Sequence, residues 1–305
     1  NNTNIDVLES ELRHQSNWLV GSAIEPISFP TARITEKKAN ERWKLGVKQA
    51  LCSMESGLLT KVMLARTISV RSTGRIYPEF LLRQLIAEYP ECRIFIIPRG
   101  DTYFIGATPE ELVSLRGQKV KSTCLAGSVS RGDSIKHDVL LAQELLKSDK
   151  DRWEHELVTH WVESRLKTLC RDLRWNDSPK VFKLSNIQHL ATTFTGLVDS
   201  NQHVLDFVNA LHPTPAVGGI PLPVAMEETR KSEECGRGWY AGPVGWMDQS
   251  GCGEFGVAIR SALVKDNEAL LYAGAGIVLG SDPESEYMET EMKFRPLLGA
   301  LGVDL

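Results

Sequence analysis

The sequence predicts an α+β fold on a chain of 305 residues. Alternating apolar residues that run into tight-turn residues predict β-hairpins, which pair antiparallel strands. Apolar residues at steps of three and four predict amphipathic helices, and these come in consecutive blocks. A doubly wound parallel sheet would instead alternate single strands with single helices, so the pattern favours α+β.

The first half of the chain supplies a helix, a strand, a short helix and two hairpins. A helix is expected from Thr35 to Gly57, with an apolar stripe of Trp43, Val47, Leu51 and Met54. Residues 61–70 alternate as a strand with one face in the core, which places Lys61 on the polar face. Pro78 then opens a short helix at its favoured first position. The apolar stripe of that helix is Phe80, Leu81, Leu85 and Ile86.

Two hairpins follow this short helix. The first pairs 92–98 with 102–107 across an Arg-Gly-Asp turn, and the second turns at Gly117.

The second half is richer in helices. Residues 134–173 read as a long helical segment with a break near Ser148, followed by a strand near 181–185. Helices are expected after Ser200-Asn201, after Pro223 and from Ser281-Asp282-Pro283, where a cap and a proline mark a helix start. Two strands, 254–264 and 269–275, are joined by a turn at 265–267.

Composition limits the classes of function. The net charge is 35 − 39 = −4, which argues against a nucleic-acid or anionic-membrane surface. No apolar run reaches 18 residues and no signal-peptide pattern is present, so a cytoplasmic protein without a membrane span is expected. The six cysteines show no metal-ligand spacing, and we expect reduced, mostly buried thiols.

Two acidic pairs are candidates for a metal site. Asp151 and Glu154 are three residues apart on one predicted helix, and Glu286 and Glu289 on another, so each pair shares a helical face. If the two helices face each other, Mg²⁺ would be the natural partner of the four carboxylates. Acidic residues at this spacing also commonly form a solvated face, and that alternative stays open.

Other polar residues are weaker candidates. Lys61 is either exposed at a strand end or, if desolvated, a general base. Glu110, His189 and His212 are each compatible with a structural role or a catalytic one. The run of small residues 272–276, which would end a strand, either makes a tight turn or binds an anion through backbone N–H groups.

Taken in order, ten segments resemble the chorismate-utilising enzymes, which include anthranilate, aminodeoxychorismate, salicylate and isochorismate synthases. The resemblance runs from about residue 60 to the C-terminus. The segments are KVMLAR (61–66), GATPE (106–110), CLAGS (124–128), KDRWEHELV (150–158), HLATTFTG (189–196), LHPTPAVGGIP (211–221), GWYAGPVGW (238–246), GVAIRSA (256–262), YAGAGIV (272–278) and SDPESEYMETEMK (281–293).

Two positions separate the members of that family. Isochorismate and salicylate synthases carry a lysine at the Lys61 position, where anthranilate synthases carry glutamine. At Ala126, aminodeoxychorismate synthases carry a nucleophilic lysine. The resemblance therefore implies an isochorismate synthase that uses Mg²⁺; a salicylate synthase and a non-catalytic chorismate-binding protein are the alternatives.

The resemblance also implies roles for residues. Lys61 would deprotonate the water that attacks C2 of chorismate, and Glu110 would protonate the departing C4 hydroxyl. Glu154 and Glu289 would hold Mg²⁺ directly, with Asp151 and Glu286 acting through water. The residues expected to contact substrate are Ala126, Gly127, Ser128, His189, Thr214, Tyr240, Arg260, Gly274 and Lys293.

The fold implied by the resemblance is a single chorismate-binding domain, 1–305, built from two stacked antiparallel sheets with outer helices. Chorismate would lie between the sheets. The sixty residues before Lys61 are fewer than in most members, so we expect a shortened N-terminal region. We further expect a monomer or weak dimer without an amidotransferase subunit.

Overall fold

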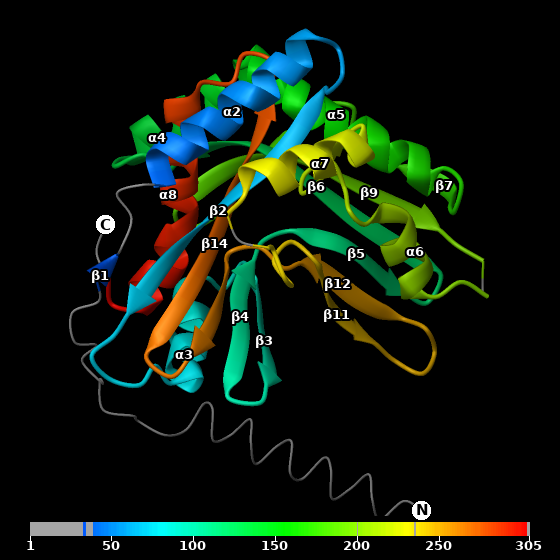
Figure 1. Ribbon diagram of the computed structural model, residues 1–305. Helices are drawn as coiled ribbons and strands as arrows, with labels where there is room; N and C mark the ends of the chain where they lie inside the picture. The colour runs from blue at the N-terminus through cyan, green and yellow to red at the C-terminus, as the bar shows by residue number, and fades with distance from the viewer. Residues whose placement is uncertain (1–32, 35–38, 200, 235, 304–305) are drawn as a thin grey trace, which may run out of the picture.

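Two antiparallel sheets of seven strands each form the framework of the molecule, and helices pack against both (Figure 1). The computed structural model describes residues 33–34, 39–199, 201–234 and 236–303. The predicted α+β class with two antiparallel sheets is confirmed. The described helices are α2 (Ala39–Glu55), α3 (Pro78–Glu88), α4 (Ile135–Lys147), α5 (Asp149–Leu166), α6 (Val204–Leu211), α7 (Leu222–Ser232) and α8 (Pro283–Ala300).

The first sheet has the strand order β1-β2-β14-β13-β4-β3, and β10 also pairs with β2. Its centre is the long pair β2–β14, which runs in register from Lys61 opposite Val278 to Arg71 opposite Glu268. Its strands are β1 (Arg33–Ile34), β2 (Lys61–Arg71), β3 (Arg93–Arg99), β4 (Thr102–Thr108), β10 (Gly219–Ile220), β13 (Ser261–Lys265) and β14 (Glu268–Val278).

The second sheet has the order β11-β12-β5-β6-β9-β7, and β8 also pairs with β9. Strand β9 follows the predicted 181–185 strand and had no counterpart among the predicted strands. The strands are β5 (Glu111–Arg116), β6 (Lys119–Ser130), β7 (Arg171–Arg174), β8 (Lys180–Lys183), β9 (Ile187–Leu197), β11 (Pro243–Met247) and β12 (Gly253–Val257).

Local sequence signals explain most element boundaries. Pro78 opens α3, and the Asp282 side chain caps α8 by accepting a hydrogen bond from the Ser285 amide at 2.8 Å. The predicted break at Ser148 is confirmed, because this residue ends α4 and caps the start of α5. Both predicted hairpins, β3–β4 and β5–β6, are present.

The predicted strand 254–264 is wrong in a way that matters for the site. Its first part is β12 in the second sheet, and its last part is β13 in the first sheet. Residues 258–260 connect the two sheets, and Arg260 has a φ of 51°, which is uncommon for a residue with a side chain. Alternation alone does not reveal this crossing, because both halves keep an apolar pattern.

Two helix predictions also need correction. The helix expected to continue to residue 173 ends at Leu166, and residues 171–174 form β7 instead. The helix expected after Ser200-Asn201 begins at Val204 with His203 as its N-cap, and residue 200 lies outside the described residues. The expected start at Thr35 also lies outside them, and α2 is described from Ala39.

Burial differs from the predicted pattern at several positions. Ile86 of the α3 stripe is exposed. Of the five cysteines that the structure describes, all are free but only Cys124 is buried, whereas we expected mostly buried thiols; Cys235 lies outside the described residues. The small-residue run does not end its strand, because β14 continues to Val278.

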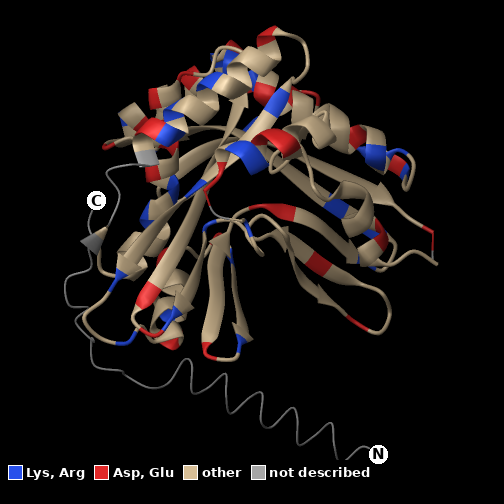
Figure 2. Ribbon diagram, in the orientation of Figure 1, with Lys and Arg blue, Asp and Glu red and all other residues tan. Residues whose placement is uncertain are grey.

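The buried apolar residues form three clusters around the two sheets. One joins α5 and α6 to the second sheet, and a second joins α3 and α8 to the first. The third packs α2 against β2 and β14, and its members include the predicted stripe residues Trp43, Val47 and Met54. In Figure 2, ribbon segments of Lys and Arg are interspersed with those of Asp and Glu along the outer helices. Among the described helices, none combines the length and apolar composition needed to cross a bilayer.

Candidate active site

A cavity lies between the two sheets and is lined by side chains from both. Strands β2 and β14 line it from the first sheet, β6 and β9 from the second, and α5 and α8 close it. Eleven of the fifteen predicted site residues line this cavity. They are Glu110, Ala126, Gly127, Ser128, Glu154, His189, Tyr240, Arg260, Gly274, Glu289 and Lys293.

Lys61 lies behind the cavity wall and reaches the site through an ion pair. Its Nζ donates to Glu154 Oε1 at 2.8 Å, and the two side chains are 0% and 9% exposed. We expected the polar face of this strand to be exposed, but residues 61–66 are largely buried on both faces. The covering α5 helix supplies Glu154, so the lysine is desolvated and paired.

Gly276 is required for this ion pair. It lies on β14, next to β2, and a Cβ there would stand 2.1 Å from Glu154 Oε1 and 3.3 Å from Lys61 Cε. The small residues of β14 therefore make room for buried side chains. The sequence suggested two roles for this run of small residues, a tight turn or anion binding, and making room for the ion pair was not one of them.

Glu110 is an acid that can be protonated near neutral pH. It follows β4, and its backbone amide donates to the Thr108 hydroxyl at 3.2 Å. Burial raises the pKa of Glu110 to about 7, although the nearby cations Lys61, Lys293 and Arg260 oppose the rise.

Arg260, His189 and Gly127 form a chain of polar contacts at the cavity wall. Arg260 Nη2 lies 3.4 Å from His189 Nε2, and His189 Nδ1 lies 3.4 Å from the Gly127 carbonyl oxygen. Because arginine only donates, Nε2 must accept and Nδ1 must carry the proton. Burial lowers the pKa of His189 to about 3, and Arg260 and Lys293 add to this effect. The imidazole is therefore neutral.

A β-bulge at Gly127 shapes the wall beside this chain. The pairing of β6 with β9 shifts register between Ala126 and Ser128, and Gly127 has a φ of 74°. A Cβ at this position would lie 3.0 Å from Asp151 Cβ and 3.2 Å from the Asp151 carbonyl oxygen. Only glycine fits both the conformation and the close approach of α5.

Lys293 lines the cavity and contacts both β14 and its own helix, α8. Its Nζ donates to the Gly274 carbonyl at 2.8 Å and to Glu289 Oε1 at 2.5 Å. Burial would raise the pKa of Glu289, but Lys293 lowers it to about 2, and hydrogen bonding with Ser128 contributes in the same direction. Glu289 is therefore an anion in the folded protein.

The four carboxylates expected to hold Mg²⁺ lie within electrostatic reach of one another. Glu154 and Glu289 both raise the pKa of Asp151, after burial as the main cause, and Glu289 raises that of Glu286 in the same way. As the side chains lie, no group of three or more acidic, histidine or cysteine residues in the described part of the chain is arranged to hold a metal ion.

The donor chemistry nevertheless fits a hard cation. Three of these carboxylates already accept from an ammonium group: Glu154 from Lys61, Glu286 from Lys150 and Glu289 from Lys293. These carboxylate oxygens are thus already placed to bind positive charge. Mg²⁺ prefers oxygen ligands of this kind, with one or two carboxylates bound directly.

Four predicted residues do not line the cavity: Lys61, Asp151, Thr214 and Glu286. Thr214 contacts a residue that lines the cavity, because its hydroxyl accepts a hydrogen bond from the backbone amide of Ala216. Tyr240 lines the cavity and stacks on Tyr272 with ring centroids 5.2 Å apart. Burial raises the pKa of Tyr240, which keeps the phenol protonated.

Several lining residues were not predicted, although most lie in or beside the family-like segments. They are Met63, Pro109, Leu125, Ala216, Val217, Ile259 and Ala273. His155 was also missed. Its Nε2 lies 2.8 Å from Thr192 Oγ1, which ties α5 to β9, and burial lowers its pKa to about 4.

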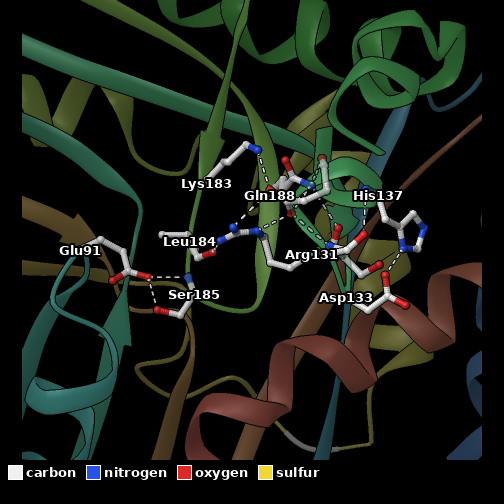
Figure 3. A network of polar contacts seen from close by, with 12 residues as sticks. Glu91, Arg131, Asp133, His137, Lys183, Leu184, Ser185 and Gln188 are labelled. Carbon is white, nitrogen blue, oxygen red and sulfur yellow. Dashed lines mark hydrogen bonds and ion pairs between the residues drawn. The ribbon is translucent and has the colours of Figure 1, made fainter. Parts of the chain in front are cut away.

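A polar network around Asp138 supports the β6–β9 pair at the end where β6 finishes and β9 begins. Figure 3 shows three members of the network, Arg131, Lys183 and Gln188. Arg131 donates to both carboxylate oxygens of this buried residue at 2.6 and 3.2 Å, and Lys183 donates at 2.6 Å. Gln188, the neighbour of His189, donates to Asp138 Oδ1 at 3.1 Å. Hydrogen bonds from Arg131 and Lys183 hold the pKa of Asp138 far below its usual range.

Comparison with known proteins agrees with this geometry. The family model described as chorismate binding enzyme matches residues 1–302. The chain belongs to the chorismate-binding enzyme family.

Relatives of this family member include the isochorismate synthase MenF of Bacillus subtilis (strain 168), 37% identical over 267 residues, which are 88% of this chain and 57% of that protein. The salicylate biosynthesis isochorismate synthase of Pseudomonas aeruginosa is 39% identical over 90% of this chain and 59% of its own length. The chain thus spans less than two thirds of these curated relatives.

Among solved structures, the menaquinone-specific isochorismate synthase MenF of Escherichia coli matches with a TM-score of 0.80 and 28% identity. The match covers 92% of this chain and 66% of that one.

Proposed function

We propose that this chain converts chorismate to isochorismate, by adding water at C2 of the ring and expelling the C4 hydroxyl. One observation carries the proposal: a carboxylic acid with a pKa of about 7 lines the cavity, and a fully buried lysine behind the cavity wall acts on it electrostatically. Both are placed by the sheets themselves, since Lys61 begins β2 and Glu110 lies between β4 and β5. The names of the relatives support the same activity.

The two residues divide the proton transfers between them. Lys61 first releases the proton that it holds in the ion pair with Glu154 and then, as the neutral amine, takes a proton from the attacking water. Glu110 gives a proton to the departing hydroxyl. Each turnover leaves Lys61 with one proton more and Glu110 with one fewer. Solvent exchange returns both to their starting states, and no net water is consumed.

Cations in the cavity bind the substrate, which carries two carboxylates. Arg260 presents a planar guanidinium that can hold a carboxylate through two hydrogen bonds, and Lys293 adds a second cation. The neutral imidazole of His189 accepts from Arg260 and so fixes the guanidinium. Gly127 and Ser128 line the cavity at the bulge, and both would donate to a substrate carboxylate.

Glu154 and Glu289 would hold Mg²⁺ directly, and Asp151 and Glu286 would act through water. When bound, the metal would orient the ring carboxylate and withdraw electron density from the ring. The expectations of a cytoplasmic compartment, a monomer or weak dimer, and no amidotransferase subunit stay predictions.

A product assay tests the proposal. The protein is incubated with chorismate and Mg²⁺, and the mixture is followed by proton NMR and by salicylate fluorescence. We expect isochorismate as the product, with Lys61→Gln binding chorismate but forming none. Stoichiometric salicylate would point to the synthase that also eliminates pyruvate. Tight binding without turnover would point to a non-catalytic binding protein.

A further inference from the structure

A fourth cation, Lys150, lies among the acidic residues but lines no part of the cavity. It sits in the first turn of α5, one residue before Asp151. Its Nζ donates to Glu286 Oε1 of α8 at 2.5 Å. The Glu286 side chain is 1% exposed and that of Lys150 is 29% exposed, so the ammonium reaches inward to a buried carboxylate.

Lys150 acts on the whole carboxylate group and not on Glu286 alone. Burial would lower the pKa of Lys150, but Glu286, Glu154 and Glu289 together raise it. Conversely, Lys150 lowers the pKa of Asp151, Glu286 and Glu289. Its ammonium therefore acts electrostatically on the four carboxylates, and its ion pair joins α5, which carries Asp151 and Glu154, to α8, which carries Glu286 and Glu289.

The neighbouring lysines differ from Lys150 in that the proposed reaction gives each of them a role. Lys61 and Lys293 also have places in the proposed chemistry, as base and as substrate ligand. Lys150 has no role in that reaction, and its side chain forms an ion pair with Glu286. A long, partly exposed lysine near a helix start can also swing its head group into solvent while its stem stays packed.

We propose that Lys150 is a built-in competitor of the divalent cation: its ammonium occupies the carboxylate group in the metal-free protein and must leave Glu286 when the metal binds. The inference rests on the metal assignment within the proposed function. Its consequence is that removing the Lys150 charge tightens metal binding, because the carboxylates lose the cation that satisfies them.

The test measures metal affinity without substrate or turnover. Mn²⁺ binding is followed by EPR of the free ion, and Mg²⁺ binding by calorimetry, for the wild type, Lys150→Met and Lys150→Gln. The glutamine variant keeps a hydrogen-bond donor for Glu286 in case the methionine variant folds poorly. Arg152→Met is the matched control, since it removes one positive charge from the same helix turn. Its side chain is 52% exposed and lies 4.0 Å from Glu156.

We expect Mn²⁺ to bind the Lys150 variants at least about tenfold more tightly, because a buried charge is screened far less than an exposed one, and to bind Arg152→Met within about twofold of the wild type. Equal or weaker binding by both Lys150 variants would overturn the proposal, as would the absence of binding in all four proteins. If the affinities shift as expected but no isochorismate forms, only the proposed function fails. If isochorismate forms and the affinities are equal, only this inference fails.

Discussion

The ion pair between Lys61 and Glu154 gives the sharpest prediction for stability. Lys61→Met removes the ammonium but keeps most of the side-chain volume, and it leaves Glu154 as a buried carboxylate without its 2.8 Å donor. Breaking a buried pair by removing one partner costs about 3–5 kcal/mol. At about 2–4 °C per kcal/mol for a chain of this size, the unfolding midpoint should fall by roughly 6–20 °C. Isochorismate formation should be lost as well.

Urea unfolding of a double-variant cycle checks this reasoning. Glu154→Gln alone leaves a buried ammonium with a weaker acceptor, and it should also destabilise the protein. The double variant Lys61→Met/Glu154→Gln contains neither charge, so it should recover much of the loss. A Lys61→Met protein as stable as the wild type, or strictly additive variants, would show that the two groups are not coupled in the folded protein.

Three further changes test other parts of the site. Glu110→Gln should lower the rate of isochorismate formation by about 10²–10⁴ while chorismate affinity in calorimetry stays within about threefold. Its raised pKa means that the folded protein holds a proton that the unfolded chain releases between about pH 4.5 and 7. Wild-type stability should therefore fall as pH rises through this window, and the fall should be smaller in Glu110→Gln; identical pH profiles would contradict this. Gly276→Ala should displace the Glu154 carboxylate and cost about 1–3 kcal/mol in urea unfolding, whereas Gly74→Ala, which has open space around it, should not. Asp138→Asn should raise the KM for chorismate more than it lowers kcat, because Asp138 supports β9 beside His189; an unchanged KM would remove that role.

Local signals in the sequence predicted what local physics decides. The proline and cap at 282–283, the break at Ser148 and the hairpin turns all depend on neighbours along the chain, and the structure confirms each of them. Eleven of the residues that the family resemblance singled out line the cavity.

The failures arise where tertiary contacts decide the outcome. Alternation along 254–264 does not show that the chain leaves one sheet for the other, and this crossing is what delivers Arg260 to the cavity. The burial of Lys61 depends on α5, which is about ninety residues away in the sequence. The alternation within the strand of Lys61 therefore predicted an exposed polar face. Lys150 was missed although its spacing to Glu154 is that of neighbours on a helix face, because its actual partner, Glu286, belongs to α8.

The charge balance of the site bears on how a protein of net charge −4 would bind the proposed dianionic substrate. The site brings together four cations, which are Lys61, Lys150, Arg260 and Lys293. Against them stand four carboxylates, Asp151, Glu154, Glu286 and Glu289, while Glu110 is largely protonated below its pKa of about 7. A dianionic substrate added to this balance leaves two negative charges in a poorly solvated space, and one divalent cation cancels them. Metal and substrate should therefore bind with positive coupling, each raising the affinity of the other by the same factor. Mn²⁺ titrations with and without chorismate on the slow Glu110→Gln variant, which keeps all four cations and all four carboxylates, measure that factor, and a value of one would mean that substrate and metal do not share the site.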